Sequence, residues 1–156
     1  MPSAADRLDD ALEKALRYLQ KRDRTAAQVR ARLAALGIDD ATAERALEEL
    51  RRQGFIDDER FARLFAEDRR RLDGWGSERI EASLRESGVD DQVIAGTLAG
   101  RGREDELADA IALLDRKSAG PPADDREREK ALGLLVRRGY ELELAYDAVR
   151  AFEAAA

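Results

Sequence analysis

The chain of 156 residues contains an internal repeat with a spacing of 51 residues. Residues 33–40 read Leu-Ala-Ala-Leu-Gly-Ile-Asp-Asp, and residues 84–91, 51 positions later, read Leu-Arg-Glu-Ser-Gly-Val-Asp-Asp. A third version, Leu-Val-Arg-Arg-Gly-Tyr-Glu-Leu, stands at residues 135–142, a further 51 positions along. A repeat of this length is typical of proteins built from stacked supersecondary units.

Each copy has the pattern of a helix–glycine–helix corner. A leucine closes an apolar helical face, and a glycine four residues later can adopt the left-handed backbone conformation that ends a helix. In the first two copies a pair of aspartates follows, which suits the N-cap and first turn of the next helix. We therefore expect an all-α protein of three tandem three-helix repeats, about nine helices in all, arranged as an elongated, curved stack.

The expected boundaries follow from the corners and from apolar residues spaced three and four apart. We expect residues 1–5 to be a disordered N-terminus. The three-helix repeats are expected at residues 6–54, 55–102 and 103–156.

Local signals add detail to this prediction. Thr25 and Gln28 have the spacing of a capping box, which predicts that a helix starts after Thr25. The large apolar residues Phe55, Phe61 and Phe65 are expected to lie in the core. No window alternates in the manner of a strand with β-branched enrichment, so we predict no sheet.

The composition narrows the possible functions. The chain has no Cys and no His, so it lacks thiolate chemistry, the commonest general base and the commonest metal ligand. We therefore expect no enzyme activity and no metal. The N-terminus does not resemble a signal peptide and no apolar run could span a bilayer, so we expect a cytosolic protein without a membrane partner.

The charge is unevenly distributed along the chain. The net charge is +1 over residues 1–54, −2 over residues 55–103 and −5 over residues 104–156. The first part could therefore face an anion, whereas the last third is expected to repel one.

Four motifs, in order, resemble those of the RecX family. Gly-Phe-Ile-Asp-Asp-Glu-Arg-Phe-Ala-Arg at residues 54–63 and Leu-Leu-Val-Arg-Arg-Gly-Tyr at residues 134–140 are similar to its two most recognisable signatures. The opening at residues 15–33 and Gly-Ser-Glu-Arg-Ile at residues 76–80 resemble its first repeat and a turn in its second. The resemblance covers roughly residues 11–152.

The resemblance implies a small regulator, most simply an inhibitor, of the recombinase RecA in DNA repair, recombination and the SOS response. Such a protein binds the RecA filament and the single-stranded DNA within it, and restrains ATP hydrolysis and strand exchange. It has three tandem three-helix repeats, no catalytic residues and no cofactor. We expect a monomer.

The candidate contact residues are basic groups outside the predicted apolar stripes, together with the single tryptophan. They are Arg22, Arg24, Arg30, Arg32, Arg69, Arg70, Arg71, Trp75 and Arg79. Each arginine could meet a phosphate or an acidic protein surface, and each could equally belong to a solvated helix face.

Several alternatives stay open at this point. Trp75 could staple the next helix, contact RecA or stack on a base. Arg137 and Arg138 match a family signature, yet their place at a helix end also fits capping. A helical module that binds single-stranded nucleic acid without RecA is the main rival function, and an assembly scaffold unrelated to recombination is another.

Overall fold

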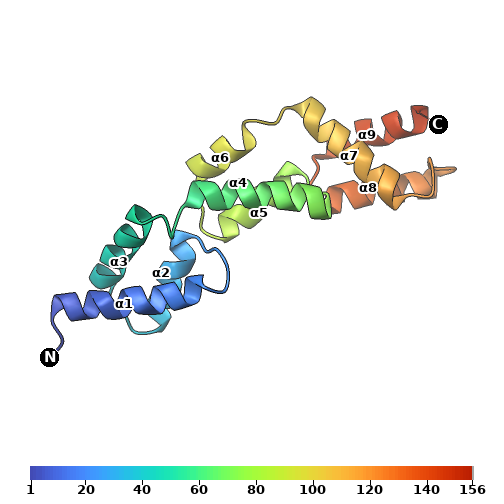
Figure 1. Ribbon diagram of the computed structural model, residues 1–156. Coiled ribbons are helices and arrows are strands. Elements are labelled where there is room, and N and C mark those ends of the chain that lie inside the picture. The colour runs from blue at the N-terminus through green and yellow to red at the C-terminus, as the bar shows by residue number, and fades with distance from the viewer. Residues whose placement is uncertain (156) are drawn as a thin grey trace. The chain divides into compact units, whose positions relative to one another are not determined.

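The computed structural model describes residues 1–155, which contain nine α-helices and no strand. The helices in order are α1 (Ala4–Leu19), α2 (Ala26–Ala35), α3 (Asp40–Arg52), α4 (Asp58–Asp68), α5 (Ser77–Glu86), α6 (Asp91–Leu98), α7 (Arg103–Lys117), α8 (Asp125–Arg137) and α9 (Leu142–Ala154) (Figure 1). A π-helical turn, η1 (Arg69–Asp73), continues α4. The predicted all-α class and the expected number of helices are confirmed.

The helix starts follow the capping signals of the sequence. Thr25 accepts a hydrogen bond from the Gln28 amide, and the Gln28 side chain accepts one from the Thr25 amide, which completes the predicted capping box of α2. Ser3 and Asp6 form a second box at α1. Because Ser3 caps this helix, α1 begins at Ala4, and residues 4 and 5 are helical where we expected disorder.

The three predicted glycine corners are present. Gly37, Gly88 and Gly139 have φ angles of 84°, 84° and 95°, in the left-handed region that favours glycine. At each corner the amide after the glycine donates to the carbonyl of the repeated leucine four residues before the glycine: Leu33, Leu84 or Leu135. The repeat in the sequence is therefore a repeat of backbone geometry.

The first three helices form one core. Each of α1, α2 and α3 packs against the other two, and the buried residues are small or aliphatic. They are Ala11, Ala15, Ala26, Val29, Leu33, Ala43, Ala46, Leu47, Leu50 and Ile56. Short alanine side chains let these helices approach closely.

The last three helices form another core in the same way. Tyr140 and Phe152 add aromatic rings to leucines and alanines from α7, α8 and α9. Tyr140 is 1% exposed and its hydroxyl donates to the Gly74 carbonyl at 3.0 Å. The buried hydroxyl of Tyr140 therefore has the hydrogen-bond partner that a buried polar group requires.

The chain divides into two compact units, and the division runs through the middle helices. One unit comprises residues 1–63 and 84–93, and the other comprises residues 64–83 and the chain from Ile94 onward. Helices α4, α5 and α6 thus contribute residues to both units. The boundaries of the three repeats stay a prediction.

The expectation that three phenylalanines lie in the core was wrong. Phe55 is 48% exposed, and Phe61 and Phe65 are only half-buried. Ala62 and Ala66 are the residues of α4 that are fully buried. Helix α4 therefore packs through small side chains, and its larger apolar groups lie along the margin of that contact.

None of the helices within residues 1–155 combines the length and the apolar character that crossing a bilayer requires.

Candidate interaction site

The start of α2 is tied to residues from the next repeat at a contact that we call the first junction. The Thr25 hydroxyl donates to the Ser87 carbonyl at 2.6 Å, and the Ala26 amide donates to Asp58 Oδ1 at 2.9 Å. A Cβ atom added at Gly88 would collide with the Cβ of Ala27. A carbonyl thus accepts from the Thr25 hydroxyl and a carboxylate accepts from a free amide at the helix start. The glycine lets the two segments approach closely.

The start of α5 is tied to the third repeat at an equivalent second junction. The Gly76 amide donates to the Arg138 carbonyl at 2.7 Å, and the Glu78 amide donates to the Gly139 carbonyl at 3.0 Å. A Cβ atom added at Gly139 would lie 2.5 Å from the Arg79 amide nitrogen. Backbone therefore packs directly on backbone here.

A carboxylate completes the second junction as well. Glu106 accepts from the Ser77 amide at 3.1 Å and from the Ser77 hydroxyl at 2.6 Å. It has the role that Asp58 has at the first junction. The signal in the sequence is the spacing, because Thr25 and Gly76, like Ser87 and Arg138, are 51 residues apart.

Two of the predicted arginines of the first repeat converge on one aromatic ring. The guanidinium of Arg24 lies 4.2 Å from the centre of the Tyr18 ring, and that of Arg32 lies 5.6 Å from it. We call these three residues the tyrosine cluster. Cation–π contacts of this kind hold the planar guanidinium by its face, and the Nε atom of Arg24 is buried without a hydrogen-bond partner.

A hollow of about 210 Å³ adjoins the tyrosine cluster. Tyr18, Arg32 and Leu36 line it together with three further cations, Lys14, Arg17 and Lys21. Lys14 pairs with Asp10 and Arg17 with Glu13 on the same helix. The hollow is therefore an aliphatic and aromatic surface with a basic margin.

The predicted tryptophan is the centre of a second cluster, the tryptophan cluster. The guanidinium of Arg79 lies 4.2 Å from the centre of the Trp75 ring and that of Arg69 lies 5.8 Å from it. Phe65 meets Trp75 edge to face, with ring centres 6.0 Å apart. Trp75 thus packs between α4 and the first turn of α5.

Hydrogen bonds fix the two arginines of the tryptophan cluster. Arg79 donates to the Arg137 carbonyl at 3.1 Å, and Arg69 donates to Asp73 at 2.5 Å. Arg79 therefore belongs both to the cluster and to the second junction. The fold therefore sets the geometry of both side chains.

The structure separates the remaining predicted residues from the clusters. Arg30 pairs with Glu44 at 2.5 Å, and the hydrogen bond raises the pKa of Arg30. Arg71 lies 3.6 Å from Asp68. Arg22 is exposed.

Arg70 lies inward rather than on the surface. Burial lowers the pKa of its guanidinium, and Arg101 beside it acts in the same direction. Burial also raises the pKa of the neighbouring carboxyl of Asp109, to which Arg101 is bonded. The three successive arginines at residues 69–71 consequently have three different surroundings, because successive side chains of a helical turn point in different directions.

Sequence reasoning missed a set of cations from the third repeat. Arg116, Lys117 and Arg138 line a hollow of about 390 Å³ together with Trp75 and Arg79. The net charge of −5 over residues 104–156 concealed them, because a net charge averages over all faces of the helices. Only the Arg137-Arg138 pair in the family signature pointed to this region.

Comparison with known proteins identifies the family. The model of the first three-helix domain of RecX matches residues 11–50, and that of the second three-helix domain of RecX matches residues 57–98. A regulatory protein RecX from Mycolicibacterium vanbaalenii is 39% identical over 163 residues, which cover 96% of this chain and 88% of that protein. This chain belongs to the RecX family.

Other RecX proteins agree with this assignment. A regulatory protein RecX from Mycolicibacterium smegmatis is 34% identical, and the match covers 92% of this chain and 79% of that protein. The crystal structure of RecX from Lactobacillus salivarius has the same fold, with a TM-score of 0.82, 19% identity and coverage of 96% and 99% of the two chains. RecX is a family of regulatory proteins rather than enzymes, and the predicted family and regulatory role are confirmed.

Proposed function

We propose that this RecX protein inhibits the recombinase RecA by binding the RecA–DNA filament and restraining its ATP hydrolysis and strand exchange. The observation that carries the proposal is the pair of clusters in which two arginines are held on one aromatic ring. They contain five of the nine candidate residues: Arg24, Arg32, Arg69, Trp75 and Arg79.

The clusters suit a partner that carries phosphates and acidic side chains. A guanidinium held on a ring has already lost part of its side-chain freedom, so less entropy is lost when its N–H edge meets an oxyanion. A filament offers many copies of the same surface, and contacts that are individually weak add as one multivalent attachment. Restraint of RecA by attachment alone requires no reactive group.

The test is RecA-dependent ATP hydrolysis on single-stranded DNA with increasing amounts of this protein. We expect inhibition by the unmodified chain. The double variants Arg24→Gln/Arg32→Gln and Arg69→Gln/Arg79→Gln should each need about tenfold more protein for half inhibition, which corresponds to about 1.4 kcal/mol of lost interaction.

The matched control is Arg45→Gln/Arg51→Gln, which removes two exposed arginines from α3 with the same change in net charge. It should inhibit like the unmodified chain. A circular dichroism melt of each variant separates loss of binding from loss of fold. Absence of inhibition by the unmodified chain would remove the proposed function, whereas equal inhibition by all variants would remove only the assigned residues.

A second candidate function is binding of single-stranded nucleic acid without RecA. The hollow beside Tyr18 favours it, since an apolar floor with a basic margin can accept a base and its phosphates. It predicts an affinity for an oligonucleotide that falls steeply with salt concentration and with Arg24→Gln/Arg32→Gln. RecA inhibition that persists in salt where no oligonucleotide binds would exclude it as the basis of activity.

A further inference from the structure

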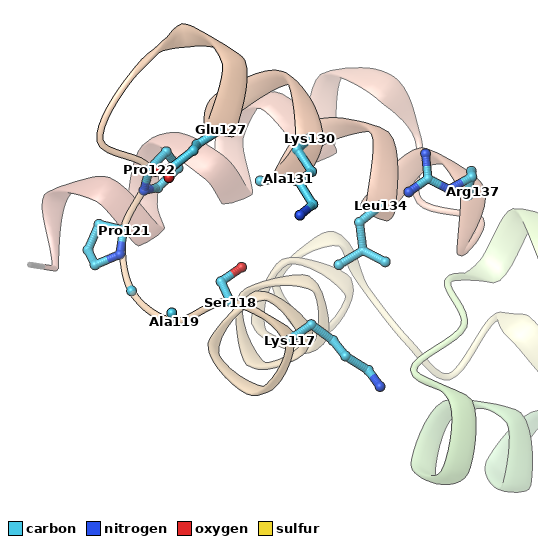
Figure 2. A pocket seen from close by; sticks show the side chains of 11 residues that line it. Lys117, Ser118, Ala119, Pro121, Pro122, Glu127, Lys130, Ala131, Leu134 and Arg137 are labelled. Carbon is cyan, nitrogen blue, oxygen red and sulfur yellow. The ribbon is translucent and has the colours of Figure 1, made fainter.

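A hollow lies between the end of α7, the loop at residues 118–122 and one side of α8. Its volume is about 660 Å³. Figure 2 shows Lys130 and Leu134 extending from α8 toward α7, with Pro121 and Pro122 at one end of the space and Arg137 near the other. We call this hollow the basic groove and define it by Lys117, Pro121, Pro122, Lys130, Leu134 and Arg137.

The charge of the basic groove is opposite to that of the repeat that forms it. Lys117, Lys130 and Arg137 line the groove, and Glu127 is the only acidic residue among the lining residues. The Glu127 carboxylate already accepts from the Ala123 amide at 2.7 Å. The groove therefore has three cations against one carboxylate, in a segment whose net charge is −5 over residues 104–156.

Gly133 leaves room for the guanidinium of Arg137. An added Cβ at Gly133 would lie 3.0 Å from Arg137 Nη1, so this guanidinium lies back along α8 over the glycine. The cation is thereby placed at one end of the groove.

The basic character continues beyond the groove. Lys117 also lines the hollow of about 390 Å³ beside Trp75, where Arg116 and Arg138 add two further cations. Leu72, which is 59% exposed, lies at this second hollow. Aliphatic groups and cations thus line two adjoining hollows, and Asp73 is the acidic residue among those that line the second.

The lining favours a protein segment over nucleic acid. No aromatic side chain is among the residues that line the groove, so stacked bases would find no ring. In the neighbouring hollow, Arg79 covers a face of Trp75 and Phe65 meets that ring edge to face. The floor offers aliphatic contact instead, through Leu134, Ala131 and the two prolines.

We propose that the basic groove docks an acidic segment of a partner protein whose carboxylates alternate with aliphatic side chains. The carboxylates pair with Lys117, Lys130 and Arg137, and an aliphatic side chain packs on Leu134. The proposal goes beyond the regulation of RecA, because it requires neither RecA nor DNA. Its failure would leave that function intact.

The test measures fluorescence polarisation of a labelled twelve-residue peptide in which Asp or Glu alternates with Leu. We expect the full chain to bind it and the triple variant Lys117→Gln/Lys130→Gln/Arg137→Gln to bind it at least about tenfold more weakly. The same peptide with Asn and Gln in place of its acids should also bind about tenfold more weakly. The control variant Arg45→Gln/Arg51→Gln/Arg63→Gln, which loses three exposed arginines elsewhere, should bind like the unmodified chain.

Backbone amide NMR shifts locate the peptide. Shifts concentrated in residues 117–137 support the proposal, and shifts concentrated elsewhere overturn it. Equal losses in the two triple variants overturn it as well, because attraction would then depend only on net charge. The proposal is also overturned if the peptide does not bind and a single-stranded oligonucleotide binds to the unmodified chain but not to the groove variant.

A second copy of this chain is the other protein that could occupy the basic groove, and it must be distinguished from a partner protein. Leu142 and Tyr146, which are 53% and 46% exposed, lie beside Glu143 on α9 and could present such a segment. Sedimentation of the unmodified chain should show no self-association. Self-association that the groove variant abolishes would replace the partner protein with another copy of this chain.

Discussion

The first and second junctions solve the same packing problem with different atoms. At the first, the side-chain hydroxyl of Thr25 reaches the Ser87 carbonyl. At the second, Gly76 stands at the equivalent position and its backbone amide reaches the Arg138 carbonyl. What the repeat preserves is therefore a hydrogen bond to one carbonyl, while the residue that supplies it has changed.

The two clusters differ in the same way. Arg24 lies over Tyr18, and 51 residues later the corresponding pair is Trp75 and Arg69, with the ring and the cation exchanged. The corresponding pair in the third repeat, Gly120 and Arg126, has no ring. A cation–aromatic contact is thus a property of the first two repeats, and the third has the basic groove instead.

The sharpest test of the comparison replaces the corner glycine of the first repeat or of the third repeat with alanine. Gly139→Ala should lower the free energy of unfolding by about 2–5 kcal/mol, from about 1–2 kcal/mol of left-handed strain plus about 1–3 kcal/mol of overpacking against the Arg79 backbone. Gly37→Ala, with no atom within 4 Å of the added Cβ, should cost only the strain term. Urea denaturation measures both, and equal losses would contradict the close approach at the second junction.

The next test concerns Thr25, which caps α2 and bonds Ser87. Thr25→Ala should cost about 1–2 kcal/mol because both hydrogen bonds disappear. Thr25→Ser retains the hydroxyl and should recover most of the loss. If serine were no better than alanine in urea denaturation, the methyl group rather than the hydroxyl would matter at this junction.

A smaller effect is expected at the apolar residue after the corner glycine, which is Ile38, Val89 or Tyr140 in the three repeats. Tyr140→Phe should cost about 1 kcal/mol, since the buried Gly74 carbonyl loses its donor. Burial raises the pKa of the Tyr140 phenol, so the folded state favours the protonated form. This contribution to stability is complete below about pH 10, the unfolded pKa, and is lost as the pH rises through the higher folded pKa.

Thermal unfolding at pH 8 and above pH 10 checks the sign of this linkage. The unmodified chain should lose more stability than Tyr140→Phe over that interval. An equal loss in the two proteins would indicate that Tyr140 does not contribute to the pH dependence.

The smallest predicted effect is a gain in stability. Gly133→Ala in α8 should raise the free energy of unfolding by about 0.5–1 kcal/mol, because alanine is the better helix former and the atom in its way is the mobile end of Arg137. A melting experiment measures the gain. Peptide binding by the same variant then shows whether displacement of Arg137 weakens the groove.

The sequence predicted the features that depend on local spacing. The corner glycines, the capping box at Thr25 and the 51-residue period each involve residues a few positions apart or an exact repetition, so the primary structure displays them directly. The pairing of two guanidinium groups on one ring was not predicted, because it depends on side-chain directions across a turn. The period could have revealed it, since position 24 maps onto position 75.

One expectation failed for a physical reason. Phe55, Phe61 and Phe65 were placed in the core because of their size, yet α4 makes its close contact through Ala62 and Ala66. The expectation that the last third repels anions stays a prediction, and its net charge did not show that Lys117 and Lys130 line one groove. The size of a side chain does not say which face of a helix it occupies. The net charge of a segment does not say which face its cations occupy.

The π-helical turn η1 fixes where Trp75 is placed. It holds one residue more than an ordinary helical turn, and in an α-helix each residue advances the chain by about 100° around the axis. Loss of a single residue from this turn would rotate everything after it relative to α4 and would carry the tryptophan away from Phe65. A family member in which this stretch is shorter by one residue would need a different ring, or none, at this place, so the length of the segment between α4 and α5 is itself a marker for the tryptophan cluster.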